Sequence, residues 1–119
     1  MKKIILAVAL LSASFVASAA PFVAAQSTST GEVAVTAKGQ FAYTDPDGKF
    51  FSCTDVTPSV DVDNSNRPYV AIGAVCGNNF IIMKQYKDDR GGSLLIRQDV
   101  ERKKKAVVME AIITKGEGI

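Results

Sequence analysis

Short segments of alternating apolar and polar residues, separated by turn-forming residues, constrain the fold of this 119-residue chain most strongly. In residues 33–44 apolar side chains recur at every second position, and the Asp45-Pro46-Asp47-Gly48 sequence that follows is a common β-turn pattern. Residues 69–76 are almost continuously apolar, and Gly77-Asn78-Asn79 leads directly into a second apolar run, as in a hairpin. The pattern predicts an all-β domain, a single small sandwich or barrel of about 6–8 short antiparallel strands.

The limits of several strands depend on single residues. Residues 49–57 are rich in aromatic and β-branched side chains, and we expect Pro58 to end that strand, with a short edge strand over 59–63. Residues 94–101 alternate, with Leu94 and Ile96 on an apolar face and Arg97 on the polar one, and 106–114 alternate again. A helix from Gln98 to Lys105 is the alternative to a hairpin there.

The N-terminus has the layout of a secretory signal peptide, with Lys2 and Lys3, then an apolar run, then small residues. Cleavage after Ala19 or after Ala25 satisfies the small-residue rule, and we favour Ala25 because Pro21 would end the apolar helix just upstream. The expected organisation is a signal peptide over 1–25, a flexible arm over 26–31 and one β domain over 32–119. The protein is then exported, either to a periplasm or out of the cell.

A transmembrane anchor is the alternative interpretation of the N-terminus. The unbroken apolar run is shorter than the roughly 20 residues that a spanning helix needs, and serines interrupt its far end. We therefore expect no transmembrane segment in the mature chain.

Cys53 and Cys76 are the only cysteines. In an exported small domain, an even pair is most simply one disulfide. Two buried free thiols, a redox pair or half of a metal site are the alternatives, but the cysteines lack the adjacent spacing of a redox motif. Metal binding would need further soft ligands, and the chain has no His.

The absence of His also excludes the usual general base and the Ser/His and Cys/His nucleophile pairs. No cofactor motif is present, so we expect no cofactor. Once Lys2 and Lys3 leave with the signal peptide, basic and acidic residues are equal in number. A net charge near zero argues against nucleic-acid binding.

Two charged segments are weak site candidates. Arg102, Lys103, Lys104 and Lys105 form a basic run that could contact an anionic partner, although a solvated turn explains it as well. Asp61, Asp63 and Ser65 alternate like the first ligands of a calcium loop, but Ile72 stands where its distal Glu should be, and turn formation is the simpler explanation.

The Asp-rich loops at residues 45–48 and 61–66 could also supply the two carboxylates of a glycosidase, which needs no His. Adjacent Phe50 and Phe51 must point to opposite faces of a strand, so an exposed one would mark a binding surface. The leading hypothesis is an exported non-enzymatic binding or interaction domain that contacts a protein or a cell-envelope component. The alternative is a calcium-binding or carboxylate-dependent hydrolase domain that uses the Asp-rich loops.

Overall fold

The computed structural model describes residues 21–117, which form nine β-strands and no helix. The expected all-β class is confirmed, with one strand more than the largest number expected. The strands are β1 (Pro21–Ser27), β2 (Val33–Ala37), β3 (Gln40–Thr44), β4 (Phe50–Ser52), β5 (Thr54–Val62), β6 (Pro68–Cys76), β7 (Asn79–Tyr86), β8 (Ser93–Asp99) and β9 (Val107–Glu117).

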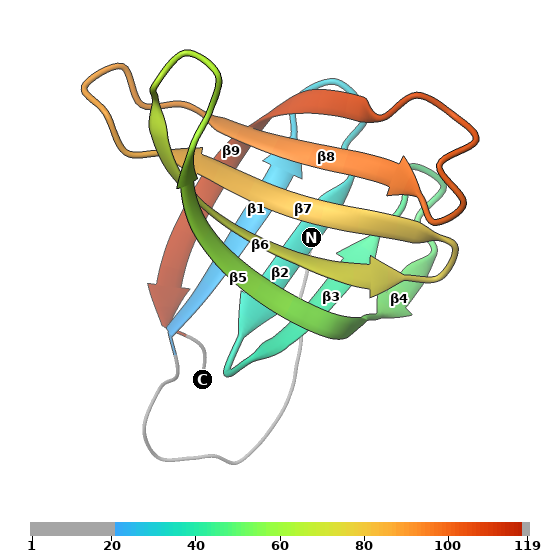
Figure 1. The fold of residues 1–119 in the computed structure, drawn as a ribbon. Helices are drawn as coiled ribbons and strands as arrows, with labels where there is room; N and C mark the ends of the chain where they lie inside the picture. Colours follow the sequence, from blue (N-terminus) through green and yellow to red (C-terminus); the bar gives the residue numbers. More distant parts are fainter. Residues whose placement is uncertain (1–20, 118–119) are drawn as a thin grey trace.

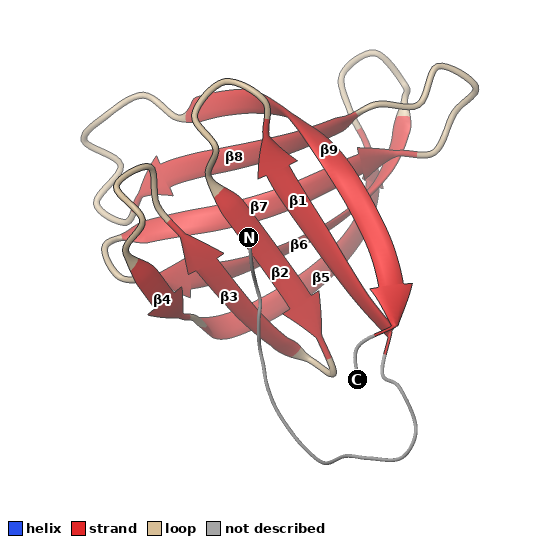
Figure 2. Cartoon of the chain, turned by 180° about the vertical axis from the view of Figure 1, so that it is seen from behind, coloured by secondary structure: helices blue, strands red, loops and turns tan. Residues whose placement is uncertain are grey.

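All strand pairs are antiparallel, in the order β4-β3-β2-β1-β9-β8-β7-β6-β5. The long strand β9 belongs to two sheets, because residues 107–110 pair with β8 and residues 111–117 pair with β1. Sheet A therefore contains β1–β4 and the end of β9, and sheet B contains the start of β9 and β5–β8. The two sheets cross and enclose a common interior (Figures 1 and 2).

The two ends of this strand order are consecutive in the chain, so the barrel is nearly closed. Only Cys53 separates β4 from β5, and its N–H donates to the carbonyl of Phe41 in β3 at 2.9 Å. Thr54 already pairs with Val75 of β6. This segment therefore passes from sheet A to sheet B, while the rest of β5 forms an edge next to β6.

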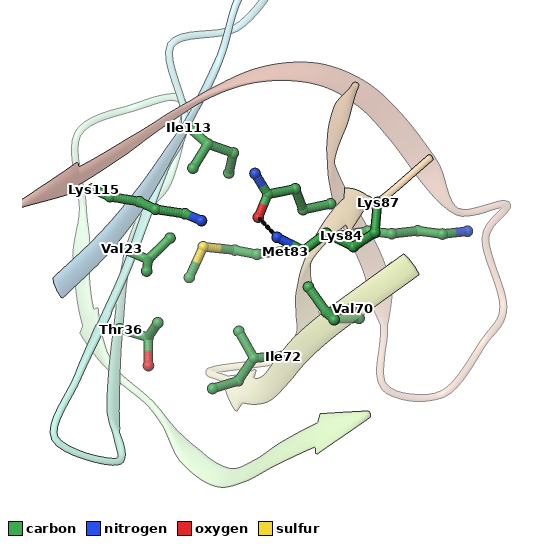
Figure 3. Close-up of a pocket in the computed structure, with 11 residues that line it drawn as sticks. Val23, Thr36, Val70, Ile72, Met83, Lys84, Lys87, Ile113 and Lys115 are labelled. Atoms are coloured by element: carbon green, nitrogen blue, oxygen red, sulfur yellow. Dashed lines mark hydrogen bonds between the residues drawn. The ribbon is translucent and has the colours of Figure 1, made fainter. Parts of the chain in front are cut away.

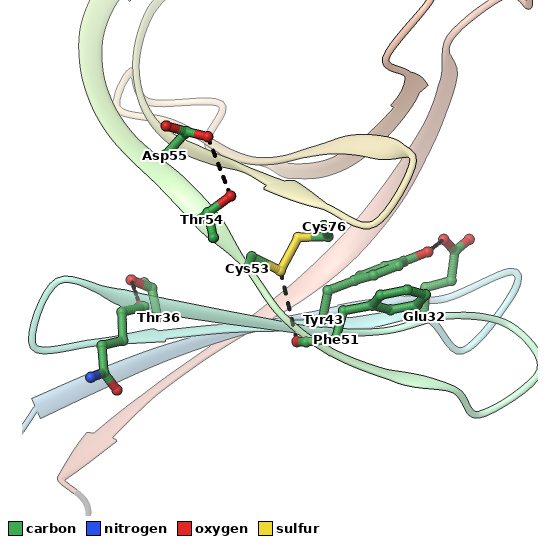
Figure 4. Close-up of a disulfide and its surroundings, with 9 residues drawn as sticks. Glu32, Thr36, Tyr43, Phe51, Cys53, Thr54, Asp55 and Cys76 are labelled. Atoms are coloured by element: carbon green, nitrogen blue, oxygen red, sulfur yellow. Dashed lines mark hydrogen bonds between the residues drawn. A yellow bond between two sulfur atoms is a disulfide. The ribbon is translucent and has the colours of Figure 1, made fainter.

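The predicted disulfide lies at this corner and is confirmed (Figure 4). Cys53 and Cys76 are joined at an S–S distance of 2.05 Å, with 23 residues of sequence separation between them. Cys76 ends β6 and is fully buried. The bond thus ties the β4–β5 junction to the neighbouring strand of sheet B.

Removing this bond should lower the free energy of unfolding. We expect the Cys53→Ala, Cys76→Ala double variant to lose about 3 kcal/mol, because the open loop restores conformational entropy to the unfolded chain. Urea unfolding followed by circular dichroism measures the loss. The reduced wild-type chain is the control, because it lacks the disulfide but keeps both cysteine side chains. A change below about 0.5 kcal/mol would show that the corner is held by packing alone.

The core consists of the alternate residues of each strand that point between the sheets. Tyr43 of β3 lies opposite Ala34 of β2, and Ala34 lies opposite Ala25 of β1. All three are buried, and the two alanines leave room for the ring of Tyr43. The other buried apolar side chains are Phe41, Ala74, Cys76, Ile81, Met83, Leu95 and Met109.

The structure places residues on both sides of the favoured cleavage position in one strand. Residues 21–25, expected to leave with the signal peptide, are the first part of β1, and Gln26 and Ser27 continue that strand instead of starting a flexible arm. Ser27 is buried, and its Oγ accepts the N–H of Thr30 at 3.1 Å, which organises the turn after β1. Small residues before residue 26 suit a tightly packed strand as well as a signal peptidase. Residues 1–20 lie outside the described part of the chain.

Two expectations about the later strands also need correction, and one alternative is ruled out. Strand β5 runs through Pro58, because an edge strand can accept a residue that has no N–H to donate. Leu95 and Arg97 of β8 point inward, so Leu94 and Ile96 lie on the outer face of sheet B. Residues 98–105 form the end of β8 and a loop, not the alternative helix.

Candidate functional site

An open pocket of about 350 Å³ lies between the two sheets (Figure 3). Strands β1, β2 and β9 supply one wall, and β6 and β7 supply the other. Its apolar lining consists mainly of Val23, Val70, Ile72, Met83 and Ile113. Such a volume is at the lower end of the range for small-molecule sites in proteins.

The strand registers explain why these side chains meet. In sheet B, Ile72 of β6 lies opposite Met83 of β7, and the next interior pair is Val70 with Gln85. In sheet A, Val23 of β1 has Thr36 on one side. Because paired residues of antiparallel strands share a face, both sheets extend the buried core toward this opening.

Two lysines continue the same interior rows at the mouth of the pocket. Lys87 follows Met83 and Gln85 at two-residue steps, and its Nζ donates to Gln85 Oε1 at 3.4 Å. Lys115 lies beside Val23 in the β1–β9 register, and its side chain extends toward Met83 (Figure 3). The mouth therefore carries two ammonium groups from opposite walls.

A third lysine, Lys84, belongs to the other face of β7. Its Nζ lies 4.1 Å from the ring centroid of Tyr69 and 5.1 Å from that of Tyr86. These cation–π contacts hold its charge on the outer surface, away from Lys87 and Lys115.

Lys87 and Lys115 form no ion pair with the side chains of residues 23–116, the part of the chain whose side chains the structure describes. The three ion pairs found there join Arg67 with Asp88, Arg97 with Glu32, and Lys103 with Glu101. No carboxylate of residues 23–116 thus neutralises the charge at the mouth of the pocket.

A buried polar cluster around Glu32 occupies the opposite end of the interior. The Glu32 carboxylate is fully buried and accepts hydrogen bonds from Tyr43 Oη, from Thr30 Oγ1 at 2.7 Å and from Arg97 Nε at 2.8 Å. Burial by itself would raise the pKa of Glu32, but these hydrogen bonds and the charge of Arg97 outweigh it and lower the pKa. Burial and the Glu32 carboxylate raise the pKa of Tyr43. The cluster is a satisfied ion pair that closes this end of the barrel.

The basic run lies in the loop between β8 and β9, away from the pocket. Asp99 organises this loop by accepting the N–H groups of Lys103 at 3.2 Å and Lys104 at 2.9 Å. The side chains of Arg102–Lys105 are exposed, and Lys103 pairs with the exposed Glu101 at 2.8 Å. Arg102 borders an open hollow of about 530 Å³ on the outer face of sheet B, whereas Lys103, Lys104 and Lys105 do not line it.

In the weak calcium candidate, the carboxylate oxygens of Asp61 and Asp63 accept hydrogen bonds from the chain. Asp63 Oδ1 accepts the N–H groups of Ser65 at 2.8 Å and Arg67 at 3.0 Å, and its Oδ2 accepts the Tyr86 hydroxyl at 2.9 Å. These bonds lower the pKa of Asp63. Asp61 Oδ1 accepts the N–H of Val62. Within the described residues no group of three or more His, Cys, Asp or Glu side chains is placed to hold a metal ion.

Of the two adjacent phenylalanines, Phe50 is the exposed one, at 66% of its full accessibility. Phe51 stacks on Tyr43, with ring centroids 5.9 Å apart, and its ring also lies against Gly77. A Cβ at Gly77 would lie 2.7 Å from that ring, and its φ of 63° also favours glycine. Phe50 therefore lies on the outer face of sheet A and does not line the pocket.

Sequence reasoning missed Lys87, Lys115, Glu32 and Arg97. The alternation predicted over 106–114 puts residues 107, 109, 111 and 113 on one face, and a further step of two places Lys115 on it. The same step extends Ile81, Met83 and Gln85 to Lys87. The signal in the sequence was thus a charged residue at a position where the two-residue alternation expects an inward-facing side chain.

Comparisons with protein-family models, with curated proteins and with solved structures found no match to this chain. The part of the chain that the structure describes contains no helix long and apolar enough to cross a membrane.

Proposed function

We propose that this protein is an exported, non-enzymatic binding domain whose ligand site is the pocket between the two sheets. The observation that carries the proposal is the continuation of the barrel interior into an open, mainly aliphatic pocket. Apolar pockets of this kind with a few polar groups at one end are typical ligand sites in small barrels.

A binding role fits the chemistry of the lining better than catalysis does. The polar groups at the pocket are the Gln85 amide, the Thr36 hydroxyl and lysine ammonium groups. The Thr36 hydroxyl donates to the carbonyl of Gln40 at 2.8 Å, so it is engaged in its own hairpin. The lining supplies groups that recognise a ligand, and the carboxylates of the Asp-rich loops lie elsewhere.

Export is supported by the disulfide and by the signal-like N-terminal sequence. In that compartment an apolar or amphipathic ligand would come from the cell envelope or its surroundings. The proposed function therefore keeps an envelope component as the partner and assigns its contact to the pocket rather than to the basic run.

A fluorescence titration with the uncharged probe N-phenylnaphthylamine tests the proposal. We expect saturable binding with increased emission, because the probe leaves water for the aliphatic pocket. Val70→Trp should fill the pocket and weaken binding about tenfold or more, a loss of about 1.4 kcal/mol.

Val75→Trp is the matched control, since Val75 lies on the same strand but on its outer face, opposite Phe80. Circular dichroism and urea unfolding establish that both variants fold. Equal probe binding by the two folded variants, or no saturable binding by the wild type, would contradict the proposal.

A further inference from the structure

We propose that the ligand is a single-chain amphiphile with a carboxylate headgroup, of the fatty-acid type, held tail inward with its carboxylate between Lys87 and Lys115. This inference rests on the proposed binding function and specifies its ligand. The observation that carries it is the convergence on one aliphatic pocket of two ammonium groups that form no ion pair with the side chains of residues 23–116.

The lining identifies the apolar part of the ligand. Val23, Val70, Ile72 and Ile113 are aliphatic, Met83 is flexible, and no aromatic ring belongs to the lining formed by the described residues. A sugar or a nucleobase would be recognised by stacking on aromatic faces, which this pocket does not offer. A flexible alkyl chain matches aliphatic and methionine side chains.

The size of the pocket limits the ligand to one chain. Its volume is about 350 Å³, whereas ligand sites in proteins extend to about 1,000 Å³. A second acyl chain would have to lie outside the walls formed by β1, β7 and β9. A diacyl lipid is therefore a poorer fit than a free single-chain acid.

The charge at the mouth identifies the headgroup. Lys115 belongs to β9 in sheet A, and Lys87 directly follows β7 of sheet B. Both lysines are exposed, and each lies an even number of residues beyond interior-facing side chains of the adjoining strand. An anion between them would gain attraction to both ammonium groups at the border of a low-dielectric interior, where screening is weaker than in bulk water. The Gln85 amide, which already accepts from Lys87, adds N–H donors beside them.

The geometry also determines the direction in which the ligand lies in the pocket. The buried core ends at Met83 and Ile113, so the tail can only extend inward from the lysines toward these residues. At the far end of the interior, Arg97 is already paired with Glu32 at 2.8 Å and offers no competing site for the carboxylate. Among residues 23–116, the ammonium groups of Lys87 and Lys115 are therefore the cations available to a ligand in the pocket, since the Nζ of Lys84 lies over the rings of Tyr69 and Tyr86.

Isothermal titration with three probes that share a decyl chain tests the inference: decanoate, decanol and decyltrimethylammonium, all below their micelle concentrations. We expect decanoate to bind at least about tenfold more tightly than decanol, and the cationic probe to bind most weakly. In the Lys87→Met, Lys115→Met double variant, decanoate affinity should fall about tenfold to the level of decanol, while decanol affinity stays within about twofold. Methionine keeps an unbranched side chain, one heavy atom shorter than lysine, and removes its charge.

Lys105→Met is the control, because Lys105 is an exposed residue of the β8–β9 loop. Its decanoate affinity should match the wild type, and every variant should retain a wild-type circular dichroism spectrum. Equal binding of decanoate and decanol by the wild type would overturn the headgroup assignment and leave the proposed function intact. Absence of binding by all three probes would remove the proposed function as well.

Binding of diacyl vesicles in preference to decanoate is the remaining outcome. If the chain sediments with anionic phosphatidylglycerol vesicles and shows no saturable decanoate binding, the single-chain assignment is wrong. If vesicle binding disappears in the Lys103→Ala, Lys104→Ala, Lys105→Ala variant, the basic loop is responsible for that contact.

Discussion

A chain that starts at Gln26 is expected to be unfolded, whereas a chain that starts at Ala20 is expected to fold. The shorter chain lacks residues 21–25 of β1, a strand that pairs with β2 on one side and with β9 on the other. It also lacks Ala25, which is fully buried beside Ala34. Breaking a central strand removes more than the roughly 5–15 kcal/mol by which domains of this kind are stable.

Far-ultraviolet circular dichroism and thermal melting of the two purified chains measure this difference. A cooperative melt is expected for the chain that starts at Ala20, and no transition for the shorter one. Matching melting curves would show that β1 is dispensable and would revise the strand order.

The same argument selects between the two signal-peptidase sites that the sequence allows. Cleavage after Ala19 leaves β1 complete, whereas cleavage after Ala25 removes most of it. We therefore expect intact-mass analysis of the exported protein to give an N-terminus at Ala20. A mature chain that begins at Gln26 and is still folded would contradict the placement of β1.

Replacing Glu32 should have the second largest effect. Glu32→Ala removes a fully buried carboxylate and leaves the Arg97 guanidinium, the Tyr43 hydroxyl and the Thr30 hydroxyl without their acceptor. Breaking a buried pair costs about 3–5 kcal/mol, and we expect the lower end of that range because the Arg97 side chain, left without its partner, is 30% exposed. Urea unfolding at neutral pH measures the decrease in the free energy of unfolding. In a domain of this size that decrease is a large part of the total stability.

Glu101→Ala is the control, because Glu101 also pairs with a basic side chain but both partners are exposed. Exposed pairs contribute little, so its stability should stay within about 0.5 kcal/mol of the wild type. Tyr43→Phe keeps the ring packed on Phe51 and removes one donor, for an expected loss of about 1–2 kcal/mol. Similar losses for the Glu32 and Glu101 variants would show that the cluster does not stabilise the barrel.

The Glu32 cluster also predicts acid sensitivity. The pKa of Glu32 is lower in the folded chain than its ordinary value of 4.5, so its stabilisation is present above that value and is lost as the pH falls through the folded pKa. Asp88 behaves in the same way, because the hydrogen bond from Arg67 lowers its pKa to about 2. Stability should therefore decline progressively between about pH 5 and pH 2. Glu32→Gln should flatten the upper part of that decline.

The fold was predictable where local patterns and packing agree. The apolar run at residues 69–76 and the turn after it predicted the β6–β7 hairpin, and the pairing of Cys53 with Cys76 followed from the cysteine count. The strand β1 was not predicted, because Pro21–Ala25 has the composition of a signal-peptide end, and only its pairing with β9, distant in sequence, identifies it as core.

The pocket could be predicted only in part. Alternation assigns faces within one strand, but it does not tell which face points inward, as Leu94 and Leu95 of β8 demonstrate. Lys87 and Lys115 are 28 residues apart in the numbering and belong to different sheets, so their convergence follows from the barrel closure. No local spacing encodes that closure.

Methyl-group nuclear magnetic resonance during a decanoate titration tests the central claim most directly. We predict saturable shifts for the methyl groups of Val23, Ile72, Met83 and Ile113, which line the pocket. The methyl groups of Ile96 and Ile112, on the outer faces of β8 and β9, should not move. Shifts confined to Ile96 and Ile112, with none at the pocket residues, would contradict binding between the sheets.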